Sequence, residues 1–150
     1  MIVDKQSFLR SNEGSMIIET AIVLPVLGIL AFGGMEASMM AARSSELQSA
    51  SAEAAAVVLA HRPRTADERD TIESIVEAST GLEDDSVTLT VKYRCETDDE
   101  LLDSKTSCDP NKLISEFITV TIVDQYVPRW TGFGIGGPIN YNYERRVQVG

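Results

Sequence analysis

The sequence has little of the chemistry that most enzymes use. It contains one histidine, His61, and two cysteines, and it has neither a Gly-x-Ser-x-Gly motif nor a glycine-rich phosphate loop. Nothing in it therefore resembles a catalytic nucleophile with its base, a metal-ligand set or a nucleotide site. We predict that the chain is not an enzyme and uses no metal and no other cofactor.

Positive charge is also scarce. The chain has 13 Lys and Arg against 23 Asp and Glu, a formal net charge of −10. An acidic chain without a basic patch is expected to bind neither nucleic acid nor a lipid-headgroup surface.

What the sequence does have is a long apolar run from Ile17 to Met35. As a helix this run spans about 28 Å, close to the ~30 Å hydrocarbon core of a bilayer. Glu19 lies inside it, where a charge costs about 2.5–3.5 kcal/mol on insertion scales. The run predicts a membrane helix, and the charge inside it marks a functional residue. Two simpler interpretations remain: a plain anchor whose Glu19 reaches the interface, and a signal peptide cut near Gly33.

The residues around Glu19 carry a family resemblance. Gly14 is followed by Ser15-Met16-Ile17-Ile18 and then by Glu19, which resembles the type IV prepilin cleavage pattern. The continuation Glu19-Thr20-Ala21-Ile22-Val23-Leu24-Pro25-Val26-Leu27, with Gly33 and Glu36, is similar to the N-terminus of TadE-like pseudopilins of tight-adherence (Flp) pili. The resemblance covers about twenty-five residues of the chain.

The resemblance implies a structural role, that of a minor pilin or pseudopilin. A prepilin peptidase would cut between Gly14 and Ser15, and Glu19 would face a positive N-terminus and set the subunit register. The implied partners are that peptidase, other pilin subunits and the assembly platform. The implied location is the bacterial inner membrane, with the N-terminus cytoplasmic, the remainder extracytoplasmic and incorporation into a pilus as a further step. The alternative is an uncleaved, single-pass protein with an extracytoplasmic binding or scaffold domain.

The chain is predicted to fold in four parts: a leader over 1–14, a transmembrane helix over 15–35, its extracytoplasmic extension over 36–62, and a small domain over 63–150. Within that domain, Thr65 and Glu68 form a capping-box pattern for a helix over 66–80 that Gly81 ends. Its acidic face is expected to be a solvated surface; the acidic residues are Asp70, Glu73 and Glu77.

Alternating residues predict three strands, near 87–94, 117–123 and 139–149. One apolar and one polar face suit an antiparallel sheet covered by helices on one side. The predicted fold class is α+β, with a long N-terminal helix, a short helix and a three-stranded antiparallel sheet, pilin-like in outline.

Three further features are candidate sites. Cys95 and Cys108 favour a disulfide, which suits an oxidising compartment, with free thiols or a metal site as alternatives. The acidic residues nearby could bind calcium, although a solvated loop is the simpler interpretation; they are Asp84, Asp85, Glu96, Asp98, Asp99, Glu100, Asp103 and Asp109. Trp130 and Phe133, in a glycine-rich stretch, could contact a partner or could fold back onto the sheet.

Overall fold

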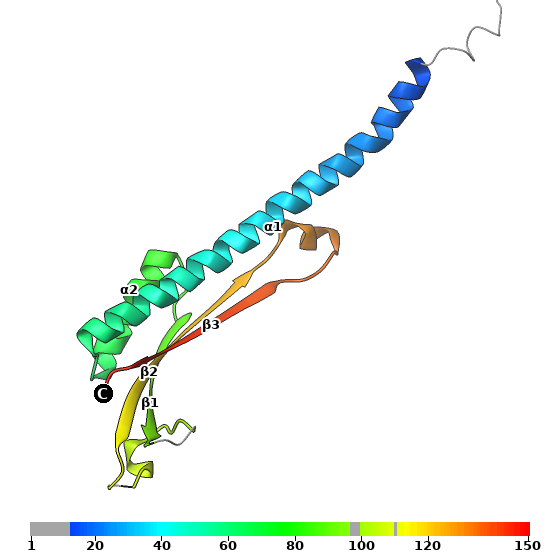
Figure 1. Cartoon of the computed structure of the whole chain (residues 1–150). Coiled ribbons are helices and arrows are strands. Elements are labelled where there is room, and N and C mark those ends of the chain that lie inside the picture. Colours follow the sequence, from blue (N-terminus) through cyan, green and yellow to red (C-terminus); the bar gives the residue numbers. More distant parts are fainter. Residues whose placement is uncertain (1–12, 97–99, 110) are drawn as a thin grey trace, which may run out of the picture. The chain divides into compact units, whose positions relative to one another are not determined.

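The structure is a computed structural model that describes residues 13–96, 100–109 and 111–150. Its elements are the helices α1 (Glu13–His61) and α2 (Ala66–Thr80), the strands β1 (Val87–Cys95), β2 (Ile114–Tyr126) and β3 (Ile139–Gln148), and two 3-10 turns, η1 (Lys105–Ser107) and η2 (Arg129–Phe133). The predicted α+β class is confirmed, with the long helix, the short helix and the three strands in the predicted order (Figure 1). The chain divides into two compact units, Met1–Met39 and Met40–Gly150.

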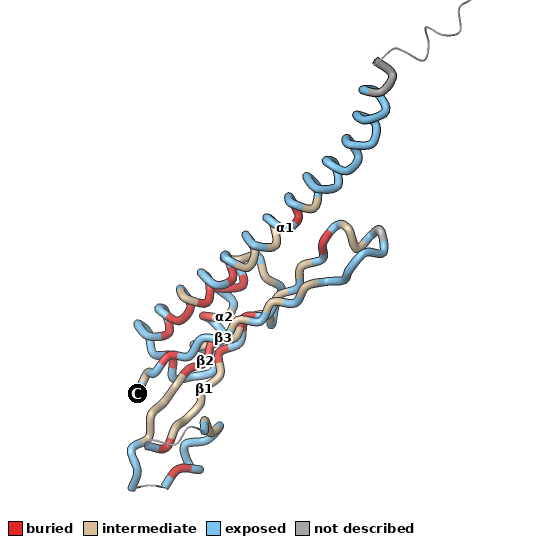
Figure 2. The backbone as a smooth tube through the Cα atoms, turned by 45° about the vertical axis from the view of Figure 1, so that its right-hand side comes forward, coloured by how far each residue is buried: buried red, intermediate tan, exposed pale blue. Residues whose placement is uncertain are grey.

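The first unit contains the N-terminal part of α1. Its large apolar side chains are exposed along the apolar run, and Figure 2 shows this part of the helix mostly in pale blue. Pro25 lies inside the helix, which continues through it. Because proline has no N–H, the carbonyl oxygen of Ala21 loses its usual helical donor.

The second unit contains the hydrophobic core. The last turns of α1 contribute Leu47, Ala50, Ala54, Ala55 and Val58 to this core; α2 contributes Ile72 and Val76, and the sheet contributes Val87, Leu89, Ile118, Val120, Ile122 and Val147. The small alanines let the helix backbone approach the sheet closely, and the β-branched residues suit the pleated face beneath it. The two helices therefore cover one face of the sheet, as the alternation of apolar residues predicts.

The register of the sheet places apolar residues opposite each other. The order is β1-β2-β3, with both pairs antiparallel. Val87 pairs with Ile122, and Leu89 pairs with Val120, so their side chains lie on the covered face. The residues between them in β1 and β2 put four threonines opposite each other on the other face; these are Thr88 with Thr121 and Thr90 with Thr119.

Polar contacts fix the helix on the sheet. The Arg43 guanidinium donates to the Asp124 carboxylate on β2 at 2.7 Å, and to the carbonyl oxygen of Thr80 at the end of α2 at 3.0 Å. Burial acts to lower the pKa of Arg43, but its hydrogen bonds to Asp124 and Glu46 outweigh that effect and raise the pKa above its ordinary value. Arg43 stays charged and joins three elements at one point.

Two tyrosines of β3 make similar contacts with α1. The hydroxyl of Tyr141 donates to the carbonyl oxygen of Met40 at 3.0 Å, and the hydroxyls of Tyr143 and Ser44 lie 2.7 Å apart. Burial, with a smaller contribution from neighbouring Tyr143, raises the pKa of Tyr141 above its ordinary value. The phenol of Tyr141 therefore remains a neutral hydrogen-bonding group at neutral pH.

The start of α2 is closed by the predicted capping box. The Glu68 backbone N–H donates to the Thr65 hydroxyl at 3.2 Å, and the Glu68 carboxylate accepts from the backbone N–H groups of Arg64 and Thr65. At the other end Gly81 adopts φ 63°, the left-handed conformation that favours glycine, and its N–H donates to the carbonyl oxygen of Glu77. The local sequence thus sets both ends of this helix.

The capping box gives a pH-dependent prediction. The hydrogen bond from the Arg64 N–H, followed by that from the Thr65 N–H, lowers the pKa of Glu68 below its ordinary value. A lowered folded-state pKa stabilises the fold fully above the unfolded-state value, and this stabilisation is lost as pH falls through the folded-state pKa. We expect Glu68→Ala to lower the melting temperature at pH 7 and to have no effect in strong acid, as measured by thermal unfolding across pH.

Asp67→Ala is the matched control for that prediction. Asp67 lies in the same first turn and feels the same helix dipole, but its carboxylate does not close the cap. An equal pH-dependent loss in both variants would assign the effect to the dipole and contradict the capping-box explanation.

The outer edge of β1 is closed by side chains of α2. The N–H of Val87 donates to the Glu77 carboxylate at 3.0 Å, and the N–H of Leu89 donates to that of Glu73 at 2.5 Å. Glu77 is 8 % exposed. The prediction that Glu73 and Glu77 belong to a solvated face was therefore wrong: being four residues apart on a helix, they lie on one side and reach two outward N–H groups of the strand.

Candidate functional site

The predicted processing site lies at the beginning of α1. The helix starts at Glu13, so the backbone of Gly14 and Ser15 is part of its first turn. Residues 1–12 of the predicted leader lie outside the described residues. Ser15 and Glu19 are four positions apart, and residues at this spacing are neighbours on one helix face, with Cβ atoms about 5–6 Å apart. The predicted register residue thus lies about one helical turn after the predicted cleavage point.

Glu19 is an exposed carboxylate among exposed apolar side chains. No hydrogen bond or ion pair of its side chain occurs within the described residues. The neighbouring Thr20 hydroxyl donates to the carbonyl oxygen of Met16 at 2.8 Å, so its hydrogen bond is made within the helix. Unlike Thr20, Glu19 has a side chain that would need a polar partner if this helix lay in a bilayer.

The segment around Glu19 can cross a membrane by its length and composition. Among the described residues, α1 is the one helix that is long and apolar enough to cross a membrane, and its apolar part lies near the N-terminus. Large apolar side chains face outward along it, including Ile17, Ile18, Ile22, Leu24, Leu27, Ile29 and Leu30, each more than half exposed. A polar solvent does not favour such a surface, whereas the hydrocarbon of a lipid bilayer does.

Cys95 and Cys108 form a disulfide, the first of the three alternatives that the sequence left open. Their Cα atoms lie 5.5 Å apart, and both residues are buried. The bond closes the loop that joins β1 to β2. Tyr93 and Leu102 also exchange two backbone hydrogen bonds of 2.8 Å, which hold Leu102 beside β1.

The acidic residues of the loop do not form a metal site among the residues described. No group of three or more carboxylate, histidine or cysteine ligands occurs there, and Asp98 and Asp99 lie outside that part of the chain. Two of the remaining carboxylates pair with lysines: Asp103 with Lys92, and Glu96 with Lys112 at 3.8 Å. These pairs are what a solvated acidic loop would form.

The aromatic candidates lie in η2. Trp130 is partly exposed, and its indole Nε1 would stand 3.5 Å from a Cβ placed on Gly136, so the ring packs closely on that glycine. Gly136 has φ 68°, and it is this backbone conformation that favours glycine there. The side chain of Phe133 lies outside the described residues. The structure thus brings Trp130 back onto its own loop, and its contact with a partner stays a prediction.

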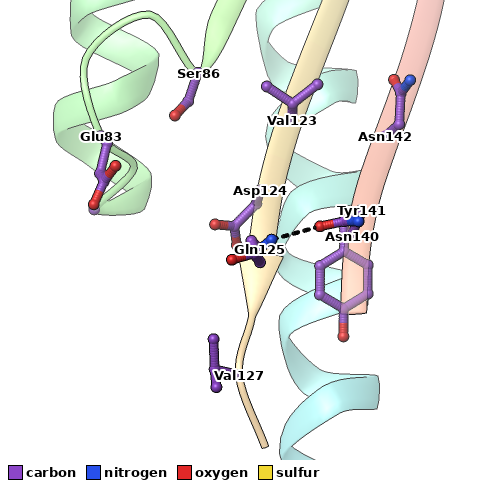
Figure 3. A pocket seen from close by; sticks show the side chains of 10 residues that line it. Glu83, Ser86, Val123, Asp124, Gln125, Val127, Asn140, Tyr141 and Asn142 are labelled. Carbon is purple, nitrogen blue, oxygen red and sulfur yellow. Dashed lines mark hydrogen bonds between the residues drawn. The ribbon is translucent and has the colours of Figure 1, made fainter. Parts of the chain in front are cut away.

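Sequence reasoning missed a groove of about 730 Å³ at the far end of β2 (Figure 3). It is lined by residues of the turn after α2 and by residues of β2 and β3: Gly81, Glu83, Ser86, Val123, Asp124, Gln125, Val127, Asn140, Tyr141 and Asn142. β2 was predicted to end near Val123 but runs to Tyr126. The groove depends on the additional residues of β2 after Val123. The alternation of apolar residues does not predict that the strand continues there.

Comparison with known proteins identifies the N-terminal part of the chain. Residues 14–56 match the model of the family described as TadE-like protein, a match that begins at Gly14 and covers under a third of the chain. This confirms the resemblance read from the sequence: the segment 14–56 is similar to that family. Neither the curated proteins nor the solved structures include a match to the chain.

Proposed function

We propose that this chain is a minor pilin or pseudopilin of a tight-adherence (Flp) pilus system. The premise is the similarity of residues 14–56 to the TadE-like family. The family match supports an association with Tad pili. The finer proposal is that a prepilin peptidase cleaves the chain after Gly14 and that the cleaved subunit takes part in pilus assembly. The single observation that carries it is Glu19, an acidic side chain in an otherwise apolar membrane-length helix, one turn after Ser15.

Electrostatics supports a link between cleavage and Glu19. A charge placed in hydrocarbon needs a compensating charge and hydrogen bonds. Cleavage after Gly14 would leave a positive amine on Ser15, at the new end of the helix and about one turn before Glu19. Within one subunit or between neighbours, that amine would offset the carboxylate and favour one axial position of the helices. Assembly would then depend on cleavage.

The location follows from the same features. The apolar part of α1 would hold the protein in the inner membrane, with the N-terminus in the cytoplasm and the unit 40–150 outside it. The disulfide supports this orientation, because disulfides persist in oxidising compartments and are rare in the cytosol. The proposed partners are the prepilin peptidase, other pilin subunits and the assembly platform.

The N-terminal residue of the protein in native membranes tests the processing. We expect intact-mass analysis to show a chain that begins at Ser15, and Gly14→Ala to give a chain that keeps its leader. Ser11→Ala, which changes the leader away from the cut, is the control and should be processed normally. A native chain that begins at Met1 would contradict processing and favour the alternative, an uncleaved membrane-anchored binding or scaffold protein.

The role of Glu19 is tested by its replacement with alanine. We expect Glu19→Ala to leave membrane insertion intact or improve it, because a charge is removed from an apolar helix. Incorporation into pili or assembly complexes should fall strongly, as measured by the amount of the protein in sheared pilus fractions and in detergent-extracted complexes.

Thr20→Ala is the matched control for Glu19→Ala, since it removes a neighbouring polar group that bonds only to its own helix. Normal piliation and normal incorporation of Glu19→Ala would argue against a register role. Loss of the protein from the membrane would instead show that the residue acts in insertion.

A further inference from the structure

We propose that the groove at the end of β2 binds an extended, positively charged segment of a partner protein, which adds to the edge of β2 where β1 stops. The proposal concerns the unit 40–150 alone. It does not depend on cleavage at Gly14 or on the role of Glu19.

The open edge arises because β2 is longer than β1. Val87, the first residue of β1, pairs with Ile122, and beyond it the Val123 N–H donates to the carbonyl oxygen of Ser86 at 2.9 Å. Ser86 does not return this bond, because its own N–H donates to the carbonyl oxygen of Glu83 at 3.2 Å. In the part of the chain that the structure describes, the Val123 carbonyl thus receives no hydrogen bond.

The same side of β2 remains open at Gln125. Backbone groups of an antiparallel strand alternate between its two neighbours, so the N–H and C=O of Gln125 point to the same side as those of Val123. β1 has ended there, and Gln125 bonds to β3 only through its side chain, which donates to Asn140 at 2.8 Å. Three successive main-chain groups therefore face the groove and are open to pairing with an added strand: the C=O of Val123 and the N–H and C=O of Gln125.

The other edges of the sheet are protected. Carboxylates of Glu73 and Glu77 cap the N–H groups of β1, and Leu102 bonds to Tyr93 farther along that strand. The outer edge of β3 carries three consecutive charged residues over 144–146, a common device against unwanted strand pairing. The end of β2 instead presents two exposed valines, Val123 and Val127, 43 % and 58 % exposed. It is the edge best suited to acquire a strand.

The size and charge of the groove define the occupant. From Asp124 to Val127 a strand at about 3.3 Å per residue runs about 13 Å, enough for a segment of about four residues. The exposed carboxylate of Glu83 lines the groove and has no ion pair in the described structure, and Asp84 and Asp85 follow it in the same turn. The chain as a whole carries a charge of −10. A lysine or arginine beside the added strand would meet this negative charge, while main-chain bonds would supply the affinity.

A synthetic peptide tests the proposal on the full chain in nanodiscs of neutral phosphatidylcholine. The probe is a capped peptide, Lys-Thr-Val-Lys-Val-Thr-Lys, and empty nanodiscs control for binding to lipid. We expect binding to slow the hydrogen exchange of the Gln125 amide. An analogue with all internal amides N-methylated cannot pair with the strand and should bind at least about tenfold more weakly.

Two pairs of variants separate the main-chain contribution from that of charge. Gln125→Pro removes the edge N–H, while Gln125→Ala keeps it, and both lose the bond to Asn140. We expect Gln125→Pro to weaken binding about tenfold and Gln125→Ala to change it less than about twofold. Glu83→Gln should weaken binding in a salt-dependent way, whereas Asp70→Asn, which changes an exposed carboxylate on α2 outside the groove, should not.

Three outcomes would overturn the proposal. They are no binding at millimolar peptide, equal binding of the N-methylated analogue, and equal binding of a peptide with glutamates in place of its lysines. If Gln125→Pro does not fold, the N-methylated peptide on the unaltered protein decides the question alone.

Discussion

Leu47→Ala is expected to lower the free energy of unfolding of the unit 40–150 by about 2–5 kcal/mol. Leu47 is fully buried, and it belongs to the core cluster that joins α1 to the sheet. Its replacement removes apolar contacts on the helix side, and the paired strands beneath it cannot collapse into the space without losing register. The effect should be large because this small unit has one core and little stability in reserve.

The fluorescence of Trp130, the one tryptophan of the chain, offers a measurement confined to this unit. Denaturant unfolding of the full chain in detergent, followed at this residue, would give the difference between variants. Leu59→Ala is the matched control, since Leu59 lies on the same helix and is 51 % exposed. A loss in Leu47→Ala no larger than that in Leu59→Ala would show that α1 does not contribute to this core.

Removal of the disulfide is expected to lower stability by about 3 kcal/mol, the typical value for a loop of this length. Cys95 and Cys108 are 13 positions apart, and the unfolded chain gains the freedom of that loop when the bond is absent. The double substitution Cys95→Ser and Cys108→Ser should shift the unfolding midpoint of the unit 40–150 accordingly. Reduction of the unaltered protein should produce nearly the same shift, as measured by unfolding with and without dithiothreitol.

The double variant also serves as the control for that experiment, because reductant should leave its midpoint unchanged. An unaltered protein whose midpoint does not respond to reductant, although its thiols are shown to be free, would contradict the assigned contribution of the bond. It would mean that the hydrogen bonds between Tyr93 and Leu102 suffice to hold the loop.

Local patterns were enough to predict the elements. Alternation of apolar residues defined the covered face of each strand, and the register pairs those residues across the sheet, as Val87 with Ile122. The capping box and Gly81 predicted both ends of α2 because each acts within a few residues of the chain. The spacing of Gly14 and Glu19 carried the family resemblance, which the match over 14–56 confirms.

Features that depend on contacts between distant segments were not predictable in this way. Glu73 and Glu77 have the sequence signature of a solvated face, and only the placement of α2 beside β1 turns them into acceptors for strand N–H groups. Asp124 and Gln125 interrupt the apolar alternation, so β2 seemed to end before them. Pairing with β3 and the ion pair with Arg43 extend the strand and create the open edge.

The closed base of the Cys95–Cys108 loop makes this loop a suitable place for a label. Its ends are fixed by the disulfide and by the bridge between Tyr93 and Leu102, so added residues would not pull on the strands. Lengthening a flexible loop costs little, about 0.6 kcal/mol for each doubling. An epitope or a fluorophore-binding tag inserted between Glu100 and Leu101, ahead of η1, would leave both α1 and the groove at β2 unaltered. The protein could then be followed on living cells without a change to the surfaces proposed for processing, register and partner binding.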